Sequence, residues 1–77
     1  MNPNKSLAKI SREYYRASNL YPEFHSNHEG FAVLQEEVDE LWDEIKKSKG
    51  VNLNDKMKHE LIQIGAMVIR FLNDLDK

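Results

Sequence analysis

Acidic side chains gather on one stretch of the chain, between Glu36 and Glu44. Six of the nine residues in this stretch are Asp or Glu. Glu37, Glu40 and Glu44 follow one another at steps of three and four residues, so on a helix they lie on one face. Like charges at this spacing repel each other by about 0.2–0.5 kcal/mol per pair. A divalent cation would remove that repulsion, and carboxylate oxygens suit a hard cation such as Mg²⁺.

A second polar pair has the same spacing further along the chain. Glu60 and Gln63 lie three residues apart in another helical pattern. If the two helices pack antiparallel with these flanks facing each other, three carboxylates and an amide oxygen surround one point. The pattern therefore predicts a Mg²⁺ site, which Mn²⁺ can also fill, with the ligands Glu37, Glu40, Glu60 and Gln63, supported by Glu44. Such a site would hold a polyphosphate and lower the pKa of a bound water for attack on phosphorus.

Basic side chains occupy one face of the first helical pattern. Lys5, Lys9, Arg12 and Arg16 recur at steps of three and four residues. A face of this kind is most often solvated. The alternative is that Lys9, Arg12 or Arg16 reaches a phosphate held by the acidic stretch. Nucleic-acid binding through the same face is a third and less favoured hypothesis.

The elements that must carry these side chains are three amphipathic helices. Apolar residues recur at steps of three and four in each of them. Ser26 followed by Glu29 fits a capping box, which marks the start of the second helix. Asn52 or Asn54 is expected to begin the third. The expected helices span residues 3–18, 27–48 and 55–74.

The third helix is apolar almost all round. Between Leu61 and Leu72 the only polar side chains are Gln63 and Arg70, and Arg70 is expected to pair with an aspartate one turn later. A helix of this kind must be covered on more than one side. We therefore expect an all-α fold, with a three-helix subunit in an antiparallel helical bundle that is completed by homo-oligomerisation. The third helix would form the interface of a homodimer or homotetramer, and Gly65 would allow a close helix approach there.

Length and composition set further limits. A chain of 77 residues forms one domain, and without cysteine it has neither a disulfide nor a thiolate metal site. A net charge of −2 does not favour nucleic acid or an anionic membrane as a partner. No apolar run approaches the roughly 20 residues of a membrane-spanning helix, and no signal-peptide core is visible. A cytoplasmic protein without a membrane partner is the expectation.

The acidic motif resembles that of a known enzyme family. Residues 36–41 read EEVDEL, and after a gap of nineteen residues beyond Glu40 the chain continues with ELIQ from Glu60. This is similar to the MazG-like all-α nucleoside triphosphate pyrophosphohydrolases, whose pattern is E-x-x-E, a variable gap, then E-x-x-D. The run FHSNHEGFAVL, which leads into the acidic stretch, adds to the resemblance. Residues 24–75 carry it best.

The resemblance implies a fold and an activity. Residues 1–77 would form a single MazG-like helical domain that assembles into oligomers. With Mg²⁺ it would cleave a nucleoside triphosphate between the α and β phosphates, giving a nucleoside monophosphate and pyrophosphate. Glu37, Glu40 and Glu60 would be the metal ligands and catalytic residues. Where the family has Asp, this chain has Gln63, a weaker ligand. A second hypothesis is therefore a non-catalytic relative that binds a nucleotide or a protein partner.

Overall fold

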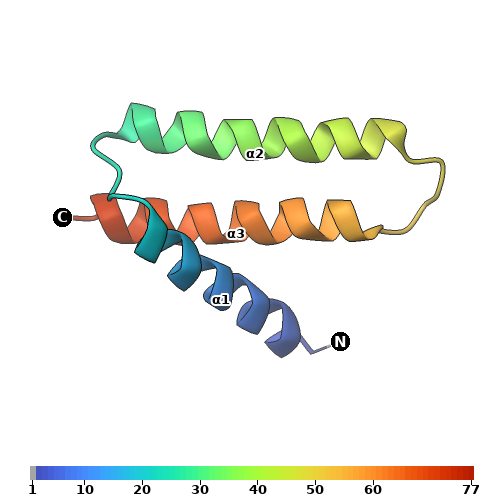
Figure 1. Cartoon of the computed structure of the whole chain (residues 1–77), viewed down its shortest axis with the longest axis horizontal. Coiled ribbons are helices and arrows are strands. Elements are labelled where there is room, and N and C mark those ends of the chain that lie inside the picture. The colour runs from blue at the N-terminus through green and yellow to red at the C-terminus, as the bar shows by residue number, and fades with distance from the viewer. Residues whose placement is uncertain (1) are drawn as a thin grey trace.

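The computed structural model describes residues 2–77, which form three α-helices joined by two loops. The helices are α1 (Asn4–Leu20), α2 (Asn27–Lys47) and α3 (Asp55–Leu75). Residues 2–77 contain no strand, which confirms the all-α prediction. The helix ends lie within two residues of those expected from the sequence. In Figure 1, α2 and α3 lie side by side and run in opposite directions, and α1 crosses α3 at a steep angle.

Side chains just before α2 and α3 fix where these helices begin. The Ser26 hydroxyl accepts a hydrogen bond from the Glu29 backbone N–H at 3.1 Å, and the Asn54 side chain accepts one from Met57 at 2.9 Å. Each bond satisfies one of the free N–H groups of a first helical turn. The capping box is incomplete, because the Glu29 carboxylate accepts from the backbone N–H of His25, at 2.7 Å, and not from Ser26.

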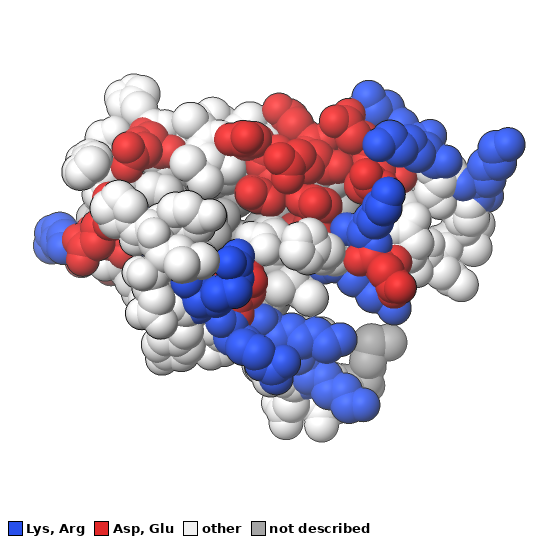
Figure 2. Space-filling view, in the orientation of Figure 1, with Lys and Arg blue, Asp and Glu red and all other residues white. Residues whose placement is uncertain are grey.

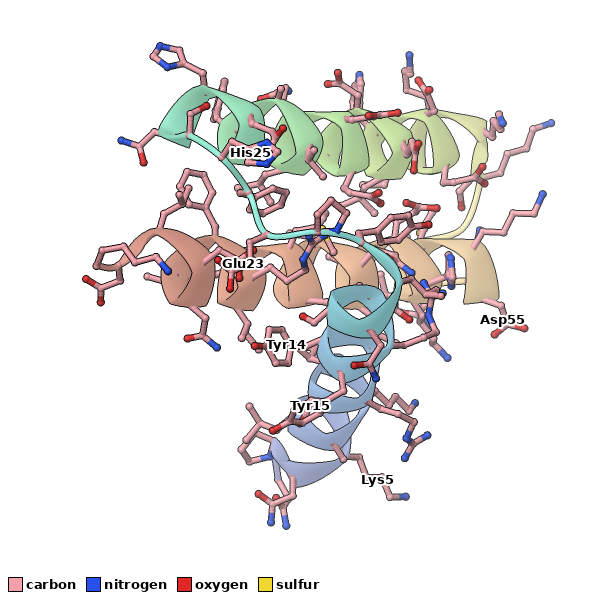
Figure 3. All side chains as sticks on the ribbon, turned by 60° about the vertical axis from the view of Figure 1, so that its left-hand side comes forward. Lys5, Tyr14, Tyr15, Glu23, His25 and Asp55 are labelled. Carbon is pink, nitrogen blue, oxygen red and sulfur yellow. The ribbon has the colours of Figure 1, made fainter. Side chains whose placement is uncertain are left out.

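The third helix is the centre of the fold. It packs against α2 on one side and against α1 on another, while the backbones of α1 and α2 stay apart throughout residues 2–77. Near the α1–α3 crossing, the Asn73 amide donates a hydrogen bond to the Tyr14 hydroxyl at 3.1 Å (Figure 3). The buried apolar side chains are few: Ala17, Phe24, Met57, Ala66 and Met67. A core of this size is typical of a chain that is close to the lower limit for independent folding.

Gly65 allows α1 to approach α3 closely. A Cβ atom placed on Gly65 would lie 2.8 Å from Cδ1 of Ile10 and 3.0 Å from its Cγ1. On α2, Gly30 has a similar role, because a Cβ atom there would lie 3.0 Å from the ring of Phe71. The close approach expected at Gly65 thus occurs within one chain, and it needs no second subunit.

Part of the apolar surface remains uncovered. Although α1 and α2 cover two sides of α3, Val68 is 41% and Leu72 is 62% exposed, and on α2 Phe31 is 59% exposed. None of the helices in residues 2–77 has the length and apolarity that crossing a lipid bilayer requires.

Candidate metal centre and adjoining cavity

The pairing of α2 with α3 brings three glutamates together. One carboxylate oxygen from each of Glu37, Glu40 and Glu60 lies within 4.8 Å of the other two. Glu37 and Glu40 lie on adjacent turns of α2, and Glu60 faces them from α3. The acidic patch of which they form part spreads over α2, with Lys and Arg side chains of α1 below it (Figure 2). We call these three residues the carboxylate group.

One oxygen of this group has no partner. Oε2 of Glu60 is buried, and no donor within residues 2–77 forms a hydrogen bond to it. A buried acceptor without a partner is costly, and each such atom in a native protein needs an explanation. A cation or a proton between the carboxylates would satisfy it. This observation is independent of the spacing that first indicated the site.

The pKa values of Glu37 and Glu40 are both raised at this site. Burial is the largest cause that raises the pKa of Glu37, from 4.5 to about 7, followed by the charge of Glu40 and a hydrogen bond with Glu60. The pKa of Glu40 is raised first by its hydrogen bond to Glu60 and then by desolvation and by the charge of Glu60. Carboxylates that lie this close together retain a proton to higher pH because their charges repel. Their oxygens are the ligands that a hard divalent cation prefers. The donor set therefore fits Mg²⁺ or Mn²⁺.

Two of the five predicted ligands have other neighbours. The Gln63 side chain lies close to Glu13 of α1, where it helps to lower the pKa of Glu13, although the bond with Arg16 is the largest cause. Glu44 lies outside the carboxylate group, and its carboxylate is 3.4 Å from the ammonium of Lys47. Both residues were assigned by helical spacing, which cannot say toward which neighbour a side chain turns.

The basic residues of α1 form part of a groove between α1 and α3. Arg16 donates two hydrogen bonds to Glu13, at 2.8 and 2.6 Å, so its charge is already paired. Lys9 and Arg12 form no ion pair within residues 2–77. The groove has a volume of about 540 Å³, and its basic side chains are Lys9, Arg12, Arg16, Lys58 and His59. The three predicted phosphate contacts therefore share one surface.

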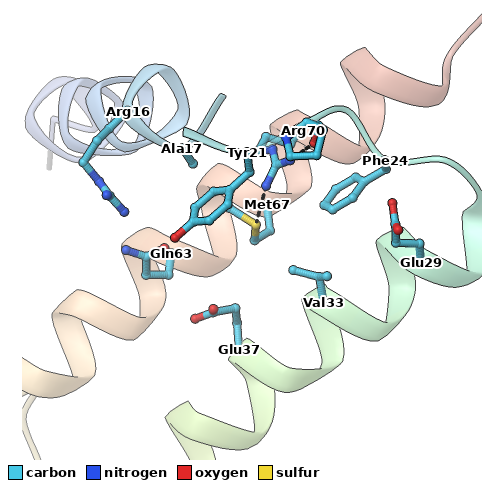
Figure 4. A pocket seen from close by; sticks show the side chains of 11 residues that line it. Arg16, Ala17, Tyr21, Phe24, Glu29, Val33, Glu37, Gln63, Met67 and Arg70 are labelled. Atoms are coloured by element: carbon cyan, nitrogen blue, oxygen red, sulfur yellow. Dashed lines mark hydrogen bonds between the residues drawn. The ribbon is translucent and has the colours of Figure 1, made fainter. Parts of the chain in front are cut away.

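A cavity of about 340 Å³ adjoins the carboxylate group and was not predicted from the sequence. Glu37 belongs to both, and Arg16 lines both the cavity and the basic groove. Figure 4 shows the side chains around the cavity, which come from all three helices and from the loop between α1 and α2. Its main walls and ends are Tyr21, Phe24, Val33, Glu37, Met67 and Arg70. The aromatic residues on either side of Pro22 were the available sequence signal.

Arg70 lines this cavity and is 4% exposed. It donates hydrogen bonds to the Pro22 carbonyl oxygen at 2.9 Å and to the Met67 sulfur at 3.7 Å, and its Cζ lies 4.4 Å from the centre of the Phe24 ring. The predicted pair with an aspartate one turn later is wrong. Asp74 instead accepts a hydrogen bond from the backbone N–H of Phe24, at 3.1 Å.

Comparisons with known proteins add no relative. No family model, no curated protein and no solved structure matches this chain. The resemblance of the acidic motif to the MazG-like family therefore stays a prediction, and the site is interpreted from its own geometry.

Proposed function

We propose that the protein is a Mg²⁺-dependent nucleotide pyrophosphohydrolase, which cleaves a nucleoside or deoxynucleoside triphosphate between the α and β phosphates. The supporting observation is the carboxylate group, in which three glutamate oxygens converge and Oε2 of Glu60 lacks a partner. The resemblance of the acidic motif to the MazG-like family supports the same reaction. The oxygen of water bonds to the α phosphorus, and the oxygen that bridges α and β leaves with pyrophosphate.

Each part of the site has a role in this proposal. Glu37, Glu40 and Glu60 hold the cation. When bound, Mg²⁺ neutralises phosphate oxygens and lowers the pKa of a coordinated water. The cavity beside Glu37 takes the nucleoside, with apolar and aromatic walls of the kind found in small-molecule sites. Arg16 lies where the cavity meets the basic groove, and with Lys9 and Arg12 it forms the basic surface that the phosphates would contact.

Metal titration tests the proposal first. We expect calorimetry with Mg²⁺, and then with Mn²⁺, to give saturable binding, which Glu37→Gln and Glu60→Gln weaken by about tenfold or more. Glu36→Gln is the matched control, because it removes the same charge from an exposed residue of α2 outside the group. Chromatography of triphosphate reactions should then show monophosphate and pyrophosphate. Equal metal binding by the wild type and the three variants would contradict the proposed site.

A second candidate is a non-catalytic relative that binds a nucleotide or a protein partner. The position of Gln63 close to Glu13 favours it, because the side chain predicted as the fourth ligand interacts with α1. Gln63→Asp separates the two candidates. A weakened enzyme should gain both Mg²⁺ affinity and turnover from the extra carboxylate, whereas a binding protein should gain metal affinity at most.

We further propose that the protein self-associates, as a homodimer or homotetramer, through the uncovered apolar surface of α2 and α3. An open groove of about 480 Å³ runs along this surface. Its apolar lining is Leu34, Val68, Phe71, Leu72 and Leu75. Burying such a surface in a partner copy would add to a core that is small for one chain.

A further inference from the structure

The cavity beside the carboxylate group contains a buried cation that the proposed reaction does not use. Arg70 lines the cavity and is 4% exposed, yet no carboxylate within residues 2–77 forms an ion pair with it. A guanidinium carries five N–H groups, and two of those of Arg70 have a protein acceptor. An unpaired buried charge is costly, so a ligand that accepts hydrogen bonds would be favoured there.

An acceptor faces the same cavity from α2. The Glu29 side chain lines the cavity and is 44% exposed. One carboxylate oxygen accepts a hydrogen bond from the backbone N–H of His25, and the other lies 3.5 Å from Nδ1 of His25, so His25 holds the carboxylate in place beside the cavity. Figure 4 shows Arg70 and Glu29 on either side of the Phe24 ring. The cavity thus offers donors from α3 and an acceptor from α2, next to an aromatic side chain.

This arrangement matches the edges of one nucleobase. Guanine presents two adjacent acceptors, O6 and N7, which an arginine fork binds with two hydrogen bonds. Its neighbouring edge presents the N1–H and 2-amino donors, which suit a carboxylate. Adenine has an amino group in place of O6, so it would turn a donor toward the donors of Arg70. Pyrimidines lack the O6 and N7 pair altogether.

We infer that the cavity selects guanine nucleotides, with Arg70 and Glu29 as the specificity-determining residues. The inference rests on the proposed function, whose substrate class it names, because the phosphates of a guanine nucleotide in the cavity would extend past Glu37 toward the carboxylate group. Phe24, which packs on the Arg70 guanidinium, keeps the fork in position. The donor pattern, and not the volume of the cavity, sets the preference.

Nucleoside binding without metal tests this inference. Guanosine, inosine and adenosine carry no phosphate, so their binding does not depend on the carboxylate group. We expect titrations followed by ¹H–¹⁵N NMR to give about tenfold or tighter binding of guanosine than of adenosine. Inosine, which keeps O6 and N7 but lacks the 2-amino group, should fall between them, and 7-deazaguanosine should bind more weakly than guanosine. Shifted resonances should include those of residues around the cavity.

Two variants separate a role in selection from a role in packing. Arg70→Met keeps the length of the side chain and removes the fork, so the preference for guanosine over adenosine should vanish, while Arg70→Lys should restore part of it. Lys49→Met is the control, because it also replaces a cation by methionine, at an exposed residue of the loop between α2 and α3 that lines neither the cavity nor the basic groove. If Arg70→Met does not fold, Glu29→Gln still tests the inference through the preference for guanosine over inosine.

The outcomes distinguish this inference from the proposed function. Equal affinity of the wild-type protein for guanosine and adenosine, or shifts confined to residues away from the cavity, would overturn the guanine assignment. A guanosine preference in a protein that neither binds Mg²⁺ nor releases pyrophosphate would support the guanine assignment and contradict the proposed hydrolase activity. Cleavage of all triphosphates at one rate, with no nucleoside preference, would support the hydrolase activity and contradict the guanine assignment.

Discussion

Glu37 links the chemistry of the site to the stability of the fold. Its pKa is raised by burial and by three neighbouring glutamates, so a proton is held in the folded protein that the unfolded chain would release. Carboxylates crowded in this way repel one another, so they lower the stability of a protein until a proton or a cation binds between them. This loss of folding stability can be measured without knowing the substrate.

We predict that the metal-free protein loses stability as the pH rises. The folded pKa of Glu37, about 7, lies above its ordinary value of 4.5, so the folded state binds this proton more tightly than the unfolded state. The resulting stabilisation is fully present below pH 4.5 and is lost as the pH rises through about 7. Thermal unfolding in a chelating buffer should show a falling Tm across this window, and Glu37→Gln should flatten the fall.

Two comparisons check that this pH dependence belongs to Glu37. Glu36→Gln, next along α2, should keep most of the wild-type slope. Added Mg²⁺ should raise the Tm most at the alkaline end of the window, since a cation competes with the proton for the same oxygens. A slope that persists unchanged in Glu37→Gln would assign it to other groups.

At the scale of helices, α3 packs closely against both α1 and α2, and a glycine allows the close approach in each case. Gly65 lies against Ile10 of α1, and Gly30 of α2 lies against Phe71 of α3. The direction in which α1 crosses α3 therefore depends on one residue that lacks a side chain. The cavity depends on that crossing, because Arg16 and Ala17 of α1 line it.

We predict that Gly65→Ala destabilises the protein. The new Cβ would meet Ile10 at 2.8 Å, so α1 must shift or Ile10 must leave its position. Overpacking of this kind costs roughly 1–3 kcal/mol, which outweighs the gain of about 1 kcal/mol in helix propensity. Chemical denaturation of the single variant and of Gly65→Ala with Ile10→Val measures the effect, and the second substitution should recover part of the loss.

Gly50→Ala serves as the control for this measurement. A Cβ atom there has only the Ser48 hydroxyl within 4 Å, at 3.9 Å, and the residue lies in the loop between α2 and α3. Its free energy of unfolding should stay close to that of the wild type. If Gly65→Ala were as stable as Gly50→Ala, the close packing of α1 on α3 would be in error.

The helices could be predicted from the sequence because their signals are local. Ser26 and Asn54 each cap a helix through a residue three positions later, and periodicity shows which face is apolar. The carboxylate group could also be predicted, since antiparallel packing of the two helices can bring Glu60 to the acidic stretch. The cavity was not, because it depends on contacts such as that between Arg70 and Pro22, 48 residues apart. Helical spacing paired Arg70 with Asp74, which instead binds Phe24.

At the scale of the whole molecule, the main feature is the apolar surface of α2 and α3 that the rest of residues 2–77 leaves uncovered. Phe31, Val68 and Leu72 are 41–62% exposed on the α2–α3 pair, beside an open groove. Exposed apolar patches of this kind commonly mark interaction sites. In the proposed assembly a second copy covers them, and the basic and acidic faces stay in water.

We predict that Leu72→Glu produces a monomer. A charge placed at the centre of the apolar surface would be buried without a partner in an assembly, which disfavours association by several kcal/mol. Sedimentation analysis of the wild type should show a dimer or tetramer. Val51→Glu is the control, because Val51 is 99% exposed in a loop, and it should leave the assembly unchanged. A wild-type protein that sediments as a monomer would contradict the proposal.

The position of α1 has a consequence for how the cavity opens. The helices α2 and α3 are neighbours along the chain. Within residues 2–77 the backbone of α1 lies close only to that of α3, through pairs far apart in the sequence such as Tyr14 and Asn73, which are 59 positions apart. Such a peripheral helix can detach as a unit while the rest of the chain stays folded. Its backbone amides should therefore exchange with solvent faster than those of α3. Because α1 forms one wall of the cavity, its local unfolding and the admission of a ligand would be a single event.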